Sequence, residues 1–256
     1  LKVGGKRLRP ILLFAVLESF NLAPQKGYHV AAALEMIHTY SLIHDDLPAL
    51  DNDDLRRGKP TNHKVFGEAM ATLAGDSLLN YAYEIMLSSS LNKENSKKYL
   101  KAIYEIAKHA GIYGMIGGQV VDVESENKII DKDKLDFIHL NKTAAMIVGC
   151  MRAGAIIGDA SEEELEKITK YSENIGLSFQ IVDDILDIVG DEEKLGKPIG
   201  SDIENHKSTY PSLLGLEKSR CIARQLIEEG KSSIKDLPSE KDFLNQLGDY
   251  IISRDC

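Results

Sequence analysis

Apolar residues in most of this chain recur three or four positions apart, which is the spacing of one face of an α-helix. Val30, Leu34 and Ile37 are one example. No segment shows the alternating β-branched pattern that is typical of strands. We therefore expect an all-α protein that folds as a helical bundle and contains a helix from Tyr28 to His44.

Two residue patterns mark helix starts in the second half of the chain. Ser161, followed three positions later by Glu164, forms the pattern of a capping box, and the helix after it is expected to reach about Ile188. Asp131 is a candidate N-cap for a helix that runs toward Ile157. Both signals therefore predict long helices on either side of residue 160.

Turn-forming and polar residues mark the loops between the expected helices. Pro238 has the position of a first-turn proline in the last helix. The expected loops are Asn21–Pro24, Asp51–Thr61, Ser89–Asn95, Gly190–His206 and Lys235–Ser239. Because none of them is a long linker rich in serine or proline, we interpret residues 1–256 as a single domain.

Composition narrows the classes of function. The formal net charge is −9, which argues against a nucleic-acid partner. No stretch reaches the roughly 20 uncharged apolar residues of a membrane span, and no signal peptide is recognisable. Three cysteines without metal-ligand spacing fit a reducing compartment, so we expect a soluble, cytoplasmic protein. The chain begins at Leu1 rather than Met, and we expect its natural beginning to be missing.

The acidic excess is concentrated in two places, and the pair Asp45–Asp46 recurs as Asp183–Asp184. Each pair ends an apolar helical run, so the two helix ends could face one cavity. Clustered carboxylates repel each other unless they are solvated or bind a metal. The plain alternative for each pair is a solvated acidic loop or helix end.

The geometry of the second acidic motif is the simpler one. Asp183 and Asp187 are four residues apart and therefore lie on one helix face, which Gln180 shares. Asp45 and Asp51 in the first motif are six apart, and Pro48 disfavours a regular helix between them. The chain must bend if Asp51 is to rejoin Asp45, which the spacing alone does not show. Carboxylate oxygens of this kind suit Mg²⁺ with a phosphate substrate.

His44, next to the first acidic pair, could bind a metal, although a hydrogen-bonding role is favoured. The glycines at 114, 117 and 118 lack the strand that a dinucleotide site requires, and close helix packing is the better interpretation.

Basic residues accompany the acidic motifs. Lys6, Arg7 and Arg9 follow two glycines, and Arg56 and Arg57 follow the first acidic motif directly. Arg gives bidentate contacts to phosphate and Lys a point charge. Each of these residues alone is more often a solvated surface charge. In combination with the acidic pairs, they suit two diphosphates, one bound through Mg²⁺ and one bound directly.

These motifs together resemble the trans-prenyl diphosphate synthases, and among them the bacterial farnesyl diphosphate synthase type. The resemblance covers essentially the whole chain. The segments that carry it are GGKRLRP at 4–10, SLIHDDLP at 41–48, DDLRRG at 53–58, LAGD at 73–76, GGQ at 117–119, FQIVDDILD at 179–187 and KSTYP at 207–211. It implies about ten helices around a deep central cavity, normally in a homodimer, with the first helix missing here.

The resemblance also implies a metal site and an allylic substrate site. About three Mg²⁺ ions would be bound by Asp45, Asp51 and Asp183, with Asp187 acting through water. The allylic diphosphate would be held by Arg56, Lys142, Thr143, Gln180 and Lys197, with Lys207 nearby. The residues implied in catalysis are Asp45, Asp51, Asp183, Lys142 and Lys197.

Isopentenyl diphosphate, the second implied substrate, would be held by Lys6, Arg9, His38 and Arg57. In the implied reaction, the allylic C–O bond breaks, the isopentenyl double bond attacks the allylic cation, and a proton is then lost. The departing pyrophosphate is expected to accept this proton. Mg²⁺ would stabilise the leaving group, and the cavity must be apolar and dry.

Product length would depend on Tyr40, five residues before Asp45, with Ser41 beside it. An aromatic residue at this place resembles the floor of a farnesyl synthase pocket; the alternative is a core tyrosine without a gating role. Geranylgeranyl diphosphate is the main alternative product. A class I terpene cyclase and a non-catalytic synthase subunit are weaker alternatives, because both acidic motifs and the basic turn are intact.

Overall fold

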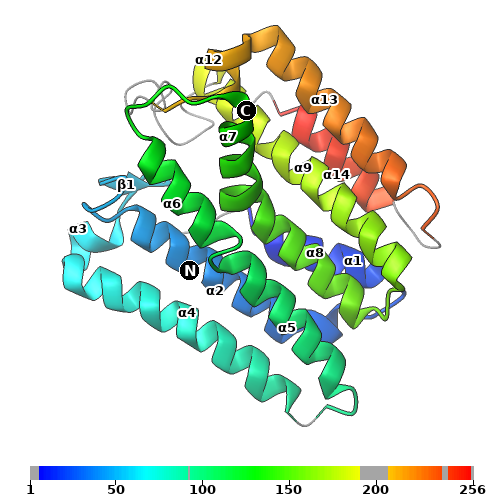
Figure 1. Cartoon of the computed structure of the whole chain (residues 1–256). Coiled ribbons are helices and arrows are strands. Elements are labelled where there is room, and N and C mark those ends of the chain that lie inside the picture. Colours follow the sequence, from blue (N-terminus) through cyan, green and yellow to red (C-terminus); the bar gives the residue numbers. More distant parts are fainter. Residues whose placement is uncertain (1–5, 92, 191–206, 238–241, 255–256) are drawn as a thin grey trace.

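The computed structural model describes residues 6–91, 93–190, 207–237 and 242–254. The described part is almost entirely helical, so the expected all-α class is confirmed (Figure 1). The α-helices are α1 (Leu8–Ser19), α2 (Tyr28–Asp45), α3 (Asn62–Phe66), α4 (Glu68–Ser90), α5 (Ser96–Ala110), α6 (Met115–Ser125), α7 (Lys132–Ile138), α8 (Ala145–Ile157), α9 (Glu162–Val189), α12 (Tyr210–Leu214), α13 (Leu216–Ser233) and α14 (Asp242–Ile252). A 3₁₀ turn, η1, spans Pro24–Gly27.

The predicted helix boundaries are close to those observed. Helix α2 begins at Tyr28 as expected. Ser161 and Glu164 form the complete capping box of α9, in which each side chain bonds the other residue's backbone N–H. The carboxylate of Asp131 accepts a hydrogen bond from the Lys134 backbone N–H at 2.9 Å. Pro238 lies outside the described residues.

The helix expected from Asp131 to Ile157 differs from the prediction in one respect. Between α7 and α8 it contains a π-helical segment, η2 (His139–Ala144). Helix α6 packs so closely on η2 that a Cβ atom at Gly118 would lie 2.2 Å from the Lys142 backbone nitrogen. This contact confirms that Gly118 serves close packing. The combined segment Lys132–Ile157 is long and apolar enough to span a membrane, but 67% of its most apolar window is buried, as in a core helix.

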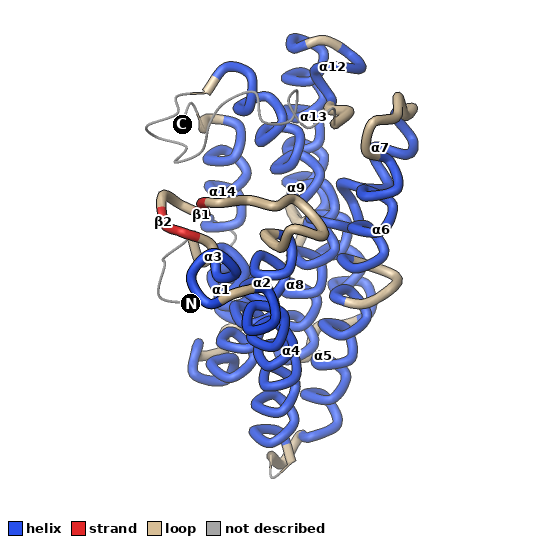
Figure 2. The backbone as a smooth tube through the Cα atoms, turned by 90° about the vertical axis from the view of Figure 1, so that its left-hand side faces the viewer, coloured by secondary structure: helices blue, strands red, loops and turns tan. Residues whose placement is uncertain are grey.

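The only strands in the described part of the chain form a small hairpin after the first acidic motif. Leu55–Arg56 (β1) pairs antiparallel with Lys59–Pro60 (β2). Figure 2 shows the hairpin at the side of the bundle, while the long helices share a common direction. The turn places Arg57 and Gly58 at positive φ, which Gly58 tolerates without strain.

Two hydrophobic clusters form the core. One joins α1, α8, α9, α13 and α14, and the other joins α1, α2, α4, α5 and α8. Helices α1 and α8 contribute to both clusters, and Figure 1 shows α8 next to α9, with α13 packed on the other side of α9. The helices α2 and α9, which carry the two acidic pairs, are therefore held in one body by shared neighbours.

Candidate functional site

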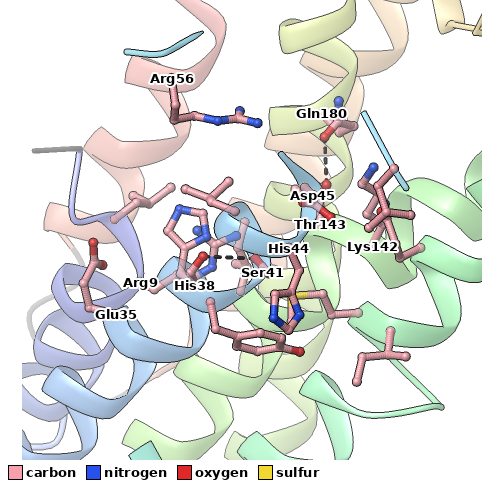
Figure 3. A pocket seen from close by; sticks show the side chains of 18 of the residues that line it. Arg9, Glu35, His38, Ser41, His44, Asp45, Arg56, Lys142, Thr143 and Gln180 are labelled. Atoms are coloured by element: carbon pink, nitrogen blue, oxygen red, sulfur yellow. Dashed lines mark hydrogen bonds between the residues drawn. The ribbon is translucent and has the colours of Figure 1, made fainter. Parts of the chain in front are cut away.

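A cavity of about 1130 Å³ lies among α1, α2, α4, α6, η2, α8 and α9. Part of its wall is apolar and is formed by Leu79, Ile116, Val120 and Ile147. The remainder is rich in charged and polar side chains, which Figure 3 shows converging from several helices. Both Asp45 and Asp183 line the cavity, from α2 and α9 respectively. The two acidic motifs thus share one hollow, 138 residues apart in the chain.

The chain bends after Asp45, as an approach of Asp51 requires. The backbone N–H of Asp51 donates to the Asp45 carbonyl at 2.9 Å, across the turn that contains Pro48. The Lys207 ammonium donates to the Asp51 carboxylate at 3.2 Å. Asp51 and Lys207 are therefore beside each other and next to Asp45, although neither is among the described residues of the cavity wall.

The second acidic motif has one partly exposed carboxylate and two buried ones. Asp183 faces the cavity, and its carboxylate forms an ion pair with the Arg254 guanidinium, with 2.8 Å between nitrogen and oxygen. That guanidinium also lies 4.8 Å from the centre of the Phe179 ring. Asp187 is only 1% exposed and is not among the described wall residues. Arg254, which follows the C-terminal helix α14, thus places a cation beside the Asp183 carboxylate.

Burial and crowding make the carboxylates costly without a cation. Burial raises the pKa of Asp45 to about 6, Lys142 opposes this rise, and the nearby charges of Asp51 and Asp46 add to it. Within the described residues, no three carboxylate, histidine or cysteine side chains converge closely enough to enclose an ion. The oxygens of Asp45 and Asp183 are hard donors of the kind that Mg²⁺ takes, together with water and phosphate.

A second part of the cavity is cationic. Lys6, Arg9, His38 and Arg57 all line it, as the implied isopentenyl site requires. Burial first, and the neighbouring Arg9 and Arg57 next, lower the pKa of His38 to about 2, so its ring is neutral near pH 7. Figure 3 shows Arg9, His38 and Glu35 close together in this region.

Glu35 is the counter-ion that sequence reasoning missed in the cationic part. It is 8% exposed and accepts a hydrogen bond from the Arg7 guanidinium. The Nε atom of Arg9 is buried without a hydrogen-bond partner in the described structure. A buried donor of this kind is costly unless a ligand satisfies it, so the region is suited to an anion.

The residues implied in binding the allylic diphosphate come from three elements. Arg56, Lys142, Thr143 and Gln180 line the cavity, and Figure 3 shows them around Asp45. Arg56 donates to the carboxylates of Asp46, at 2.8 Å from its Nε, and of Asp53. Lys142 donates to Asp122 at 2.6 Å, and the Thr143 hydroxyl donates to the Gln180 side-chain carbonyl at 2.8 Å. Lys197 lies outside the described residues.

Tyr40 lines the cavity and is 5% exposed. Its ring packs edge-on against His44 with 5.6 Å between the ring centres, and its hydroxyl is buried without a hydrogen-bond partner among the described residues. Burial raises the pKa of Tyr40 to about 12. Ser41 also lines the cavity, and its hydroxyl donates to the His38 carbonyl at 3.0 Å. The favoured hydrogen-bonding role of His44 is present: its Nε2 lies 3.0 Å from the Thr72 carbonyl.

Sequence reasoning assigned no role to three other wall residues, although each lies in a segment that carries the family resemblance: Asp76, Gln119 and Phe179. It also missed Asp122 and Arg254, the partners of the wall residues Lys142 and Asp183. Gln119 had a signal, since it ends the Gly-Gly-Gln segment. Arg254 had none, because its partner Asp183 is 71 residues away in the sequence.

Comparison with known proteins gives matches over nearly the whole chain. A family model described as "Polyprenyl synthetase" matches residues 1–243. A farnesyl diphosphate synthase of Bacillus subtilis is 51% identical over 255 residues, which cover 100% of this chain and 86% of that relative. A geranylgeranyl diphosphate synthase of Cyanophora paradoxa is 45% identical over 255 residues, which cover 99% of this chain and 85% of that relative.

A solved structure supports the same grouping. A geranyltransferase of Helicobacter pylori, complexed with magnesium and isoprenyl diphosphate, has a TM-score of 0.83 and 33% identity. The match covers 98% of this chain and 83% of that structure.

Proposed function

Because this chain belongs to the polyprenyl synthetase family and is a prenyltransferase, we propose that it condenses isopentenyl diphosphate with allylic diphosphates, chiefly to farnesyl diphosphate. The observation that carries this proposal is the approach of Asp45 and Asp183 to one cavity that also contains two groups of cations and an apolar wall. A diphosphate and a hydrocarbon chain are the two halves of an isoprenoid substrate, and the cavity offers a matching surface to each.

Mg²⁺, about three ions with the allylic diphosphate, would be held by Asp45, Asp51 and Asp183, with Asp187 acting through water. When bound, these ions stabilise the negative charge that develops on the pyrophosphate leaving group. The magnesium complex of the Helicobacter pylori geranyltransferase and the crowded Asp45 carboxylate support this assignment.

The chain's own residues bind and orient the allylic substrate. Arg56, Lys142 and Gln180 would contact the diphosphate, and Thr143 would hold the Gln180 amide in place. Lys197 and Lys207 are further cations of this site by the family resemblance. Apolar side chains around the hydrocarbon exclude water, which would otherwise quench the allylic cation.

Isopentenyl diphosphate would occupy the cationic part of the cavity. Lys6, Arg9 and Arg57 supply charge, and neutral His38 supplies a hydrogen bond rather than a charge. The two substrates would thereby be held next to each other, which converts their encounter into a reaction within one complex. The proton lost after the new C–C bond forms would pass to the departing pyrophosphate.

Tyr40 is proposed as the floor that limits product length. Its buried ring closes part of the cavity beside His44. Tyr40→Ala should remove the aromatic ring and let the product grow to C20 or longer. Tyr83→Phe, which keeps the ring of a neighbouring, partly buried tyrosine on α4, is the matched control. Unchanged product length in Tyr40→Ala would overturn the floor assignment.

The test of the function is a product assay. Purified protein is supplied with dimethylallyl and isopentenyl diphosphates and Mg²⁺, and the dephosphorylated products are separated by chain length. We expect mainly the C15 alcohol. A main C20 product would favour the geranylgeranyl alternative, which the Cyanophora paradoxa relative supports. Absence of any C15 or longer product would contradict the proposal.

We also propose a homodimer in the cytoplasm. Large apolar side chains on α4, on α5 and in the turn between α5 and α6 are more than half exposed, including Leu73, Tyr104, Ile112 and Tyr113. A second copy could bury this surface. Light scattering after size-exclusion chromatography should give twice the mass of one chain; the mass of a single chain would contradict the dimer.

A further inference from the structure

The middle carboxylate of the second acidic motif, Asp184, has a role that differs from that of its neighbour. Asp183 faces the cavity, whereas Asp184 is 3% exposed and is not among the described wall residues. A buried carboxylate is costly unless hydrogen bonds compensate for its lost hydration. The partners of Asp184 therefore indicate what the residue does.

Three elements supply these partners. Oδ2 of Asp184 accepts a hydrogen bond from the Tyr210 backbone N–H at 3.0 Å, at the start of α12. The same oxygen lies 3.0 Å from Nε2 of His139, the first residue of the π-helix η2. Oδ1 accepts from the side-chain amide of Gln180 at 3.2 Å, one turn earlier on α9. One carboxylate thus connects α9, η2 and α12.

His139 is itself fixed in this position. It is 7% exposed and stacks on the Tyr210 ring, with 5.7 Å between ring centres and 17° between planes. The Tyr210 hydroxyl donates to Asp136 on α7. Because His139 begins the π-helix that carries Lys142 and Thr143, its bond to Asp184 sets where that helix lies against α9.

The contact with Gln180 reaches the cavity. A carboxylate only accepts hydrogen bonds, so the Gln180 NH₂ group must face Asp184. Its carbonyl oxygen then faces Thr143, whose hydroxyl donates to it at 2.8 Å. Both Gln180 and Thr143 line the cavity, and Figure 3 shows this hydrogen bond next to Asp45. The orientation of a wall amide is thus determined by a buried carboxylate.

We propose that Asp184 is a positioning residue for the allylic diphosphate site: through His139 and Gln180 it fixes the π-helix and the wall amide against α9. The proposal rests on the proposed function, because that function identifies which substrate occupies this wall. Asp184 binds no metal in this account. Its effect on the substrate contacts is comparable to that of a residue that hydrogen-bonds a metal ligand and fixes its orientation. Loss of such a partner typically costs 10–100-fold in affinity or activity.

Replacing Asp184 by asparagine tests whether the network needs a side chain that only accepts hydrogen bonds. Asp184→Asn has nearly the same shape, but its single carbonyl oxygen cannot accept from all three donors. If that oxygen keeps Tyr210 and His139, the new NH₂ group faces Gln180 and should turn its amide over, away from the arrangement with Thr143. We expect the KM for geranyl diphosphate to rise about tenfold, while the KM for isopentenyl diphosphate stays within about twofold.

His139 provides a second pair of variants. In His139→Gln, the side-chain Nε2 can reach nearly the same position as the histidine Nε2 and still donate to Asp184, whereas His139→Leu cannot donate. We expect His139→Gln to retain most of the geranyl diphosphate affinity and His139→Leu to lose about as much as Asp184→Asn. The double variant Asp184→Asn/His139→Leu should be little worse than either single variant, since coupled contacts are not additive.

A binding measurement separates positioning from turnover. Calorimetric titration with the unreactive thiolo analogue of geranyl diphosphate, in the presence of Mg²⁺, should show about tenfold weaker binding in Asp184→Asn and His139→Leu. Ser178→Ala is the matched control, because Ser178 lies on the same helix and donates a buried hydrogen bond to the Ala223 carbonyl at 3.0 Å. It should lower the melting temperature without changing analogue binding.

The outcomes are distinguishable. Equal losses for both substrates, or unchanged analogue binding with only a lower melting temperature, would overturn the positioning role. So would a His139→Gln variant as poor as His139→Leu, or full additivity in the double variant. If Asp184→Asn does not fold, the two His139 variants decide the question. Failure of the proposed function would instead appear in the wild type, as absence of condensation product.

Discussion

The two acidic pairs have the same sequence but are held differently. In each pair the first residue faces the cavity, and the second, Asp46 or Asp184, is 3% exposed. Asp46 is held by Arg56, ten residues later in the β-hairpin that follows the motif. Asp184 is held by His139 and the Tyr210 backbone, 45 and 26 residues away. The first pair is thus fixed locally and the second by tertiary packing.

This difference indicates how each half of the site can fail. The local contact between Asp46 and Arg56 should be insensitive to changes elsewhere in the bundle, because the turn and the hairpin are consecutive in the chain. The tertiary contacts of Asp184 depend on how η2 and α12 pack against α9, and α6 in turn packs on η2. We therefore expect the second pair to respond to distant packing changes that leave the first pair unaffected.

The largest effect should follow from replacing the first, cavity-facing aspartate of either pair. Asp45→Asn or Asp183→Asn removes a cavity-facing carboxylate, and we expect kcat/KM to fall by about a hundredfold or more, since charge stabilisation of several kcal/mol is involved. Asp46→Asn should cost about tenfold at most, because Arg56 retains Asp53. Steady-state kinetics at saturating Mg²⁺ measures both. Equal losses in Asp45→Asn and Asp46→Asn would remove the distinction between facing and buried carboxylates.

An intermediate effect should come from α6. In Gly118→Ala the new Cβ would clash with the Lys142 backbone, and overpacking of this kind costs about 1–3 kcal/mol of unfolding free energy. We expect the loss of geranyl diphosphate affinity to exceed the loss of isopentenyl diphosphate affinity. Denaturant unfolding and the two KM values provide the test.

The control for Gly118→Ala is Gly230→Ala on α13, where the nearest atom to a new Cβ is 3.4 Å away. Helix propensity should make this variant neutral or up to about 1 kcal/mol more stable. A Gly118→Ala protein that is as stable and as active as Gly230→Ala would show that the close packing of α6 on η2 is not needed.

The smallest effect concerns α2, which carries the first pair. His38 stays neutral in the folded protein because its pKa is lowered to about 2, whereas the unfolded chain takes up a proton near pH 6.5. Below pH 6.5 the unfolded state therefore binds more protons, and the free energy of unfolding falls by up to about 1.4 kcal/mol per pH unit from this group. Unfolding curves of wild type and His38→Asn between pH 5 and 7 measure it.

The exposed His29 at the start of the same helix provides the control. His29→Asn should keep the pH slope of the wild type, while His38→Asn should flatten it. Identical slopes for His38→Asn and wild type would mean that His38 is protonated in the folded protein, and a charge would then have to be added to the cationic part of the cavity.

The fold was predictable where the signals are local. The helical spacing in α2, the Asp131 N-cap and the Ser161–Glu164 capping box each depend on residues within a few positions, and all three are observed. The π-helical segment was not predictable from local spacing, and neither was the close approach of Gly118 to its Lys142 backbone, which only the tertiary fold creates. The hairpin after the first acidic motif is local, but its strands are only two residues long, too short to show an alternating pattern.

The site shows the same division. Spacing placed Asp183 and Gln180 on one face of α9, and both line the cavity. Spacing could not show whether Asp51 returns to Asp45, since that depends on the turn at Pro48 and its backbone hydrogen bond. Two further contacts join segments that are distant in the sequence, so no local pattern predicts them: Arg254 with Asp183, and His139 with Asp184.

The most direct test of the account is a crystal structure of this protein with Mg²⁺ and pyrophosphate. We expect metal ions at about 2.0–2.1 Å from carboxylate oxygens of Asp45 and Asp183, the distance typical of Mg²⁺. Asp46 and Asp184 should keep their bonds to Arg56 and His139 and ligate no ion. Ions bound by Asp46 or Asp184, or pyrophosphate bound without any metal at Asp45 and Asp183, would contradict the division between facing and buried carboxylates.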